Sequence, residues 1–133
     1  MDKVLERFQA HYTSYYGEKD WEFLEEDGRF LFLTFLKPII NGTGHYYVDA
    51  GTRDQRRTDI IVDYHGKQYI IELKIWHGEE YQVKGRKQLC DYLDSYEQNK
   101  GWLVSFCFNK AKEKKTGIKK INEAGKIITE VVI

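Results

Sequence analysis

The stretch Asp59–Ile75, DIIVDYHGKQYIIELKI, contains two apolar runs on either side of a His-Gly pair. Runs rich in β-branched residues around a short turn are typical of a β-hairpin. The second run nevertheless carries Glu72 and Lys74 among isoleucine and leucine. Burying a charge costs free energy unless the charge is paired. We therefore expect these two side chains to have either a partner or a function.

The length of the turn decides which hairpin residues share a face. Side chains alternate between the two faces of a strand, which places Glu72 and Lys74 together. A two-residue loop at His65 and Gly66 would place Asp59 opposite Glu72, with Cβ atoms about 5 Å apart. A loop shifted by one residue would place Asp59 opposite Lys74, whereas a loop of odd length would move it to the other face. Two of these three registers bring the three charged residues together.

Such a cluster suits a divalent cation. Two neighbouring carboxylates repel each other unless positive charge lies between them. Mg²⁺ prefers one or two carboxylates and takes its other ligands from water and phosphate oxygens. Lys74 could then orient an attacking water and stabilise charge on a phosphate. The pattern predicts a Mg²⁺ or Mn²⁺ site for phosphodiester hydrolysis. The alternative is a salt-bridged trio on a solvated face of the sheet.

Length and composition limit the class of protein. The 133 residues, 41% of them hydrophobic and 15% aromatic, suffice for one folded domain with its own core. The formal net charge is zero, so any nucleic-acid surface must be local. Cys90 and Cys107 lie in apolar patterns, as expected for buried free thiols. Without a signal peptide or an apolar run that could span a bilayer, we expect a cytoplasmic protein with no membrane partner.

Hydrophobic periodicity predicts three helices and five strands. The helices are expected over Asp2–Tyr16, Asp20–Leu36 and Glu80–Tyr96, with Pro38 just after the second one. The strands are expected over His45–Thr52, Thr58–Tyr64, Gln68–Ile75, Trp102–Phe108 and Lys126–Ile133. The segment Lys110–Lys126 is rich in lysine, which could contact a nucleic-acid backbone or simply form a solvated face. The order predicts one α/β domain over 1–133, with a mixed sheet, a crossover helix and an N-terminal helical extension over 1–19.

The spacing of the charged residues resembles a known signature. Asp59 is followed, after twelve residues, by Glu72-Leu73-Lys74, and Gln88 lies in the next predicted helix. This resembles the D…(D/E)-x-K…Q signature of the PD-(D/E)XK nuclease superfamily. The longer run from FLKPIINGTGHYYV through RRTDIIVDYHGKQYIIELKIWHGEEY to KQLCDYL resembles the nuclease-like domain at the C-terminus of certain bacterial AAA-ATPase-like proteins. The residue before Asp59 is threonine rather than the proline of the superfamily name.

The resemblance implies a restriction-endonuclease-like core, in which helices flank a mixed central sheet in the order α-β-β-β-α-β. It also implies roles for single residues. Asp59 and Glu72 would bind the metal together with the backbone carbonyl of Leu73. Lys74 would be the catalytic lysine, and Gln88 would reach back from its helix towards the site.

Further groups could complete such a site. Many relatives carry a glutamate on the first core helix, and here Glu26 is preferred over Glu22 and Glu25. Each of these three could equally lie on a solvated helix face. Three arginines precede the hairpin and could bind phosphates as bidentate donors, or belong to a solvated loop: Arg53, Arg56 and Arg57.

The sequence thus predicts a Mg²⁺- or Mn²⁺-dependent deoxyribonuclease with DNA as its partner. One alternative is a catalytically weak or inactive module of the same fold that binds nucleic acid or protein. Another is a regulatory or oligomerisation partner of an AAA-type ATPase in cis or in trans, suggested by the aromatic residues Trp21, Tyr46 and Trp76 if they are exposed. A homodimer is also open, because many nucleases of this fold use one to cut both strands.

Overall fold

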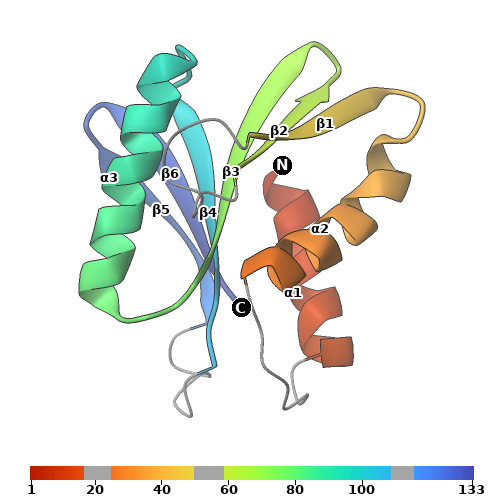
Figure 1. The fold of residues 1–133 in the computed structure, drawn as a ribbon, viewed down its shortest axis with the longest axis horizontal. Coiled ribbons are helices and arrows are strands. Elements are labelled where there is room, and N and C mark those ends of the chain that lie inside the picture. The colour runs from red at the N-terminus through yellow and green to blue at the C-terminus, as the bar shows by residue number, and fades with distance from the viewer. Residues whose placement is uncertain (17–24, 50–58, 109–115) are drawn as a thin grey trace.

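The computed structural model describes residues 1–16, 25–49, 59–108 and 116–133 (Figure 1). The helices in these ranges are α1 (Asp2–Tyr16), α2 (Glu25–Ile40) and α3 (Glu79–Ser95). The strands are β1 (Gly44–Asp49), β2 (Asp59–Tyr64), β3 (Lys67–Ile75), β4 (Lys100–Phe106), β5 (Gly117–Glu123) and β6 (Lys126–Val132).

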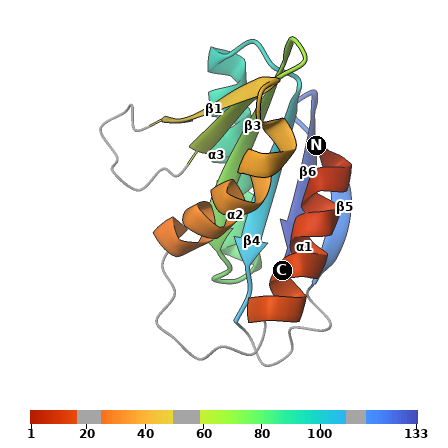
Figure 2. The ribbon, with the colours of Figure 1, turned by 90° about the vertical axis from the view of Figure 1, so that its right-hand side faces the viewer.

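The six strands form one mixed sheet in the order β1-β2-β3-β4-β6-β5. The pairs β3–β4 and β4–β6 are parallel, and the other neighbouring pairs are antiparallel. Helix α3 connects the parallel neighbours β3 and β4, as a crossover helix must. It covers one face of the sheet, while α1 and α2 cover the other (Figures 1 and 2). The predicted α/β class with a mixed sheet and a crossover helix is therefore confirmed.

Each face of the sheet carries its own hydrophobic cluster. The cluster on the α1 and α2 side includes Leu5, Phe8, Tyr12, Phe32, Leu36, Ile60, Val62, Ile71, Leu73 and Val104. The cluster on the α3 side includes Ile61, Ile70, Leu89, Leu93, Leu103 and Ile128. Because Ile71 and Leu73 belong to one cluster and Ile70 to the other, the predicted alternation along β3 is confirmed. The helix predicted as an extension contributes directly to the first cluster.

Both cysteines lie in the interior, as the sequence predicts. Cys90 and Cys107 are free and buried. The Cys90 thiol donates a weak hydrogen bond to the Glu123 carbonyl, with 3.8 Å between sulfur and oxygen. Burial raises the pKa of Cys90, which favours the protonated thiol.

Helix α2 extends further than predicted, since it ends at Ile40 with Pro38 inside its last turn. A proline in a helix lacks the N–H that would donate to the carbonyl four residues earlier. That carbonyl belongs to Thr34, an exposed residue, so water can replace the missing donor. Ile40 is 4% exposed and packs in the core. The burial of Ile40 stabilises the last turn of the helix although the proline removes one backbone hydrogen bond.

Strand β5 was not predicted, because GIKKINE shows no regular alternation and its side chains are mostly exposed. It forms through pairing with β6 across a turn at Ala124 and Gly125, both with positive φ. Two such residues are what a tight hairpin turn requires. Lysines on an edge strand also oppose unwanted pairing with another chain.

Two of the aromatic residues considered for oligomerisation are less exposed than that alternative requires. Tyr46 is partly buried against the core, and Trp76 is also only partly exposed. Trp21 lies outside the described residues. In the described part of the chain, none of the helices combines the length and apolar character needed to cross a membrane.

Candidate functional site

The β2–β3 hairpin has the two-residue turn that the sequence left as one of three possibilities. His65 and Gly66 have φ values of 52° and 74°. Residues with positive φ at both central positions give a turn whose twist matches that of the flanking strands. The turn pairs Tyr64 with Lys67, and the ladder continues to the pair Asp59–Glu72. The backbone register thus places position 59 directly opposite Glu72; the Asp59 side chain lies outside the described residues.

Glu72 is a buried carboxylate with a nearby cation. It is 3% exposed, and its Oε1 lies 3.3 Å from Lys74 Nζ. Glu72 and Lys74 are two positions apart on β3 and therefore project from the same face, the one covered by α3. Part of the alternative interpretation is thus correct: these two side chains form an ion pair. Both are nevertheless largely buried rather than solvated, with side-chain exposures of 4% and 12%.

Lys74 is enclosed by one flank of α3. Its ammonium donates a hydrogen bond of 3.0 Å to Gln88 Oε1 and lies 5.3 Å from the centre of the Tyr81 ring. Gly85 lies between these residues on the helix, and a Cβ there would be 3.4 Å from Lys74 Cδ. Positions 81, 85 and 88 share one side of a helix because of its 3.6-residue period. Gln88, which the resemblance places near the site, thus contacts Lys74, whereas the contact with Tyr81 was not foreseen.

A buried polar pair adjoins this site on β4. The parallel register places Ser105 beside Lys74, and Ser105 Oγ donates a 2.9 Å hydrogen bond to Gln82 Oε1. Gln82 is 3% exposed, and its Nε2 has no hydrogen-bond partner among the described residues. Sequence reasoning missed this pair, because Gln82 looks like any surface amide until α3 is packed on the sheet.

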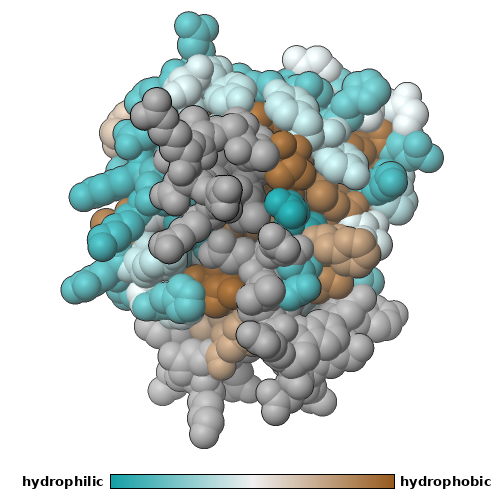
Figure 3. Space-filling model, in the orientation of Figure 1, coloured by the Kyte–Doolittle hydropathy of each residue, from teal (hydrophilic) through white to brown (hydrophobic). Residues whose placement is uncertain are grey.

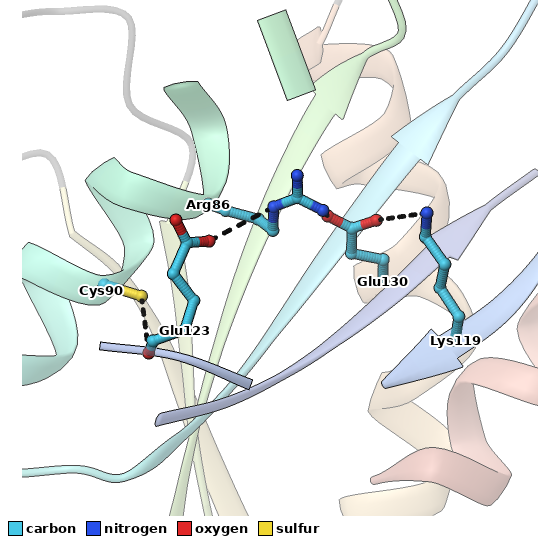
Figure 4. A network of polar contacts seen from close by, with 5 residues as sticks. All are labelled: Arg86, Cys90, Lys119, Glu123 and Glu130. Atoms are coloured by element: carbon cyan, nitrogen blue, oxygen red, sulfur yellow. Dashed lines mark hydrogen bonds and ion pairs between the residues drawn. The ribbon is translucent and has the colours of Figure 1, made fainter. Parts of the chain in front are cut away.

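A larger charge network lies further across the same face (Figure 4). Glu130 of β6 is 1% exposed; its Oε1 lies 2.9 Å from Arg86 Nη1 and its Oε2 lies 3.6 Å from Lys119 Nζ. Arg86 Nε lies 3.3 Å from Glu123 Oε2, an ion pair without hydrogen-bond geometry. Two cations thus balance two carboxylates. We assign this network to docking α3 onto β5 and β6, since no charge in it is left over for a ligand.

Other described lysines of the predicted basic segment are also paired with carboxylates. Lys120 lies 3.0 Å from Asp2 Oδ2, and Lys126 forms an ion pair with Asp94. Lys119 and Lys120 lie on β5, and Lys126 is the first residue of β6. The described part of this segment therefore has less free positive charge than its composition suggests.

The expected metal site falls partly outside the described residues. Among those residues, no group of three or more His, Cys, Asp and Glu side chains is placed to hold a metal ion. Arg53, Arg56, Arg57 and Glu22 lie outside the described ranges, as does everything but the backbone of Glu25 and Glu26. The last described pair of the β2–β3 ladder is Asp59–Glu72, and Leu73 is the next residue of β3. The Leu73 side chain is fully buried on the opposite face.

Comparison with known proteins gives no match to any family model, curated protein or solved structure. The chemistry of this chain must therefore be inferred from its own residues.

Proposed function

We propose that this protein is a Mg²⁺- or Mn²⁺-dependent nuclease that hydrolyses phosphodiester bonds of DNA. The observation that carries the proposal is the position of Lys74, held between the buried carboxylate of Glu72 and the amide of Gln88. Negative charge develops on the phosphate oxygens in the transition state of phosphodiester hydrolysis. An ammonium held at the position of Lys74 would stabilise that charge.

The order of the elements supports the same proposal. From α2 to β4, the described elements follow the order helix, three strands, helix, strand. This is the α-β-β-β-α-β order of the restriction-endonuclease-like core that we propose for this chain. In such a core the hairpin supplies the carboxylates and the lysine, and the following helix supplies the glutamine.

The donor set suits a hard divalent cation. Glu72 offers a carboxylate, Leu73 follows it on β3 with its backbone carbonyl, and position 59 lies opposite Glu72. All three donors are oxygens, which Mg²⁺ prefers. When bound there, Mg²⁺ would polarise the scissile phosphate and lower the pKa of a coordinated water.

The residues of the chain have separate tasks in this proposal. Glu72 would hold the divalent metal ion in place of its contact with the Lys74 ammonium. Lys74 stays bound to Gln88 and donates to the phosphate or orients the attacking water. Glu26, Arg53, Arg56 and Arg57 remain candidates for a further metal ligand and for phosphate contacts.

A second candidate function is a module of this fold that binds nucleic acid or protein without cleaving it, for example as a regulatory partner of an AAA-type ATPase. The Glu72–Lys74 ion pair favours it in one respect, because the pair satisfies both charges without a metal. The close approach of Gln88 and Tyr81 to the same ammonium favours the nuclease, since a simple ion pair needs neither.

Cleavage assays separate the two functions. The protein is incubated with supercoiled plasmid and with single-stranded DNA in Mg²⁺, Mn²⁺ or EDTA. We expect cleavage with either metal, none in EDTA, and none for Glu72→Gln or Lys74→Met. Lys100→Met is the matched control, because Lys100 is exposed at the opposite end of the sheet and should leave cleavage unchanged. Cleavage that survives in Glu72→Gln would contradict the proposal.

A further inference from the structure

Tyr81 is an exposed aromatic residue whose ring is nevertheless held in place. It is 41% exposed. Its ring centre lies 5.3 Å from Lys74 Nζ and 5.0 Å from the centre of the His77 ring, with the two ring planes at 89°. A cation near an aromatic ring and an edge-to-face pair are both attractive arrangements. The ring is thus positioned next to the proposed site while much of its surface stays accessible.

The same flank of α3 carries positive charge. Tyr81, Lys84 and Gln88 follow one another at i, i+3 and i+7, so they form one stripe along the helix. Tyr81 and Gln88 both contact Lys74, which means that this stripe borders the proposed site. Lys84 lies between them and is exposed. Glu80 lies four residues before Lys84 and therefore projects from the same side of the helix, about 40° from Lys84.

The outer surface of α3 is otherwise hydrophilic. In the space-filling view, the side of the molecule where Figure 1 places α3 is covered mainly by hydrophilic residues (Figure 3). Tyr81 is one of the few large hydrophobic side chains that are exposed in the described part of the chain. Its ring is not needed to complete either hydrophobic cluster, because it belongs to neither.

We propose that Tyr81 is a stacking platform for an unpaired nucleobase, with Lys84 contacting the neighbouring phosphate, so that the substrate strand is single-stranded DNA. The inference rests on the proposed nuclease function. Base–aromatic stacking beside cationic side chains is how proteins bind single strands without reading their sequence. In a duplex the faces of each base are covered by its neighbours, so the ring could not reach them.

Binding is measured first without cleavage, by fluorescence anisotropy in EDTA with a labelled single strand and the matching duplex. We expect the wild type to prefer the single strand. Tyr81→Leu, which keeps an apolar cover on Lys74 but has no ring, should bind the single strand about 5- to 150-fold more weakly. Tyr81→Phe should bind like the wild type. Tyr47→Leu is the matched control, because Tyr47 is also 41% exposed but lies on β1.

Stacking itself is read with a single strand that contains 2-aminopurine, whose fluorescence is quenched when it stacks. Quenching should persist in Tyr81→Phe and disappear in Tyr81→Leu, and thermal melts check that both variants are folded. Equal affinity of the wild type for single strand and duplex would overturn the inference. Single-strand affinity of Tyr81→Leu equal to that of the wild type or of Tyr47→Leu would also overturn it.

Cleavage of the same single strand is then measured with Mg²⁺ or Mn²⁺. Tyr81-dependent binding without cleavage in either metal would overturn the nuclease proposal alone. Cleavage with Tyr81-independent binding would overturn the stacking inference alone.

Discussion

Gly85 of α3 lies directly against the Lys74 side chain of β3. A Cβ at position 85 would be 3.4 Å from Lys74 Cδ and Cε, and 3.5 Å from Nζ. These are ordinary van der Waals distances, so a methyl group would fit, whereas a larger side chain would have to move the lysine. Glycine inside a helix costs up to about 1 kcal/mol relative to alanine. Substitutions at position 85 can therefore test helix stability and the placement of Lys74 separately.

Gly85→Ala should raise the free energy of unfolding by up to about 1 kcal/mol and preserve the proposed cleavage, because Lys74 can stay in place. Gly85→Leu should displace Lys74 and abolish cleavage while the protein stays folded. Urea denaturation and cleavage of single-stranded DNA measure the two effects. Gly101→Ala is the contrasting control: its Cβ would lie 2.8 Å from Leu93 Cδ1 in the core, so it should destabilise. A destabilised Gly85→Ala would contradict the observed spacing.

Metal binding should depend differently on Glu72 and on Lys74. Lys74→Met removes the cation that competes for Glu72, so stabilisation by Mg²⁺ should persist or increase, although the metal-free protein becomes less stable. Glu72→Gln should abolish that stabilisation, which grows as RT ln(1 + [L]/Kd) for a ligand of the folded state. Thermal melts with and without Mg²⁺ measure both variants. If both lose similar stability and the wild type does not respond to Mg²⁺, Glu72 and Lys74 merely pair with each other.

The charge network below α3 should govern stability rather than the proposed chemistry. Glu130→Leu leaves Arg86 without its shortest ion pair, and breaking a buried pair costs about 3–5 kcal/mol. The double variant Arg86→Met/Glu130→Leu should recover much of this loss, since Lys119 and Glu123 can be solvated at their exposures of 60% and 26%. Urea denaturation of both variants gives the coupling. A loss of Mg²⁺ response in a folded double variant would instead link the network to the metal site.

Acid should weaken the contact between α1 and β4. Trp102 Nε1 donates a 2.8 Å hydrogen bond to Asp2 Oδ1, and this bond, with Lys120 nearby, lowers the pKa of Asp2 from its ordinary value of 3.8. A folded-state pKa below the unfolded one gives stability that is present above the unfolded value and lost as pH falls through the folded value. Tm should therefore fall more for the wild type than for Asp2→Asn below about pH 4. Parallel acid titrations of the two proteins would contradict this.

DNA affinity should fall steeply from low to physiological salt, with weak sequence preference, because phosphate contacts release counterions and carry no base information. Lys84→Ala should reduce the slope of log K against log salt by about 1. Lys119→Ala is the control: its ammonium is already paired with Glu130, so the slope should not change. Anisotropy titrations at several salt concentrations measure both. A DNA affinity that does not change with salt concentration would count against a nucleic-acid partner.

The sequence alone was enough to predict the hairpin, the crossover helix and the shared face of Glu72 and Lys74. These features depend on local periodicity, since alternation along one strand needs no knowledge of the rest of the chain. It also indicated that Gln88 would approach Lys74, although that expectation came from the resemblance and not from periodicity. The turn left three registers open, and the backbone at His65 and Gly66 selects the one that pairs Asp59 with Glu72.

Only the tertiary structure decided which side chains surround Lys74 and which charges α3 buries. Tyr81, Gly85 and Gln82 look like ordinary helix residues until the crossover lays α3 over β3 and β4. Glu130 and Arg86 are 44 residues apart in the sequence. They meet only because β6 is the neighbour of β4 in the sheet and α3 packs over both strands. Strand β5 exists because β6 gives it a partner for its backbone. Partnerships of this kind depend on strand order and helix placement, which local sequence patterns do not encode.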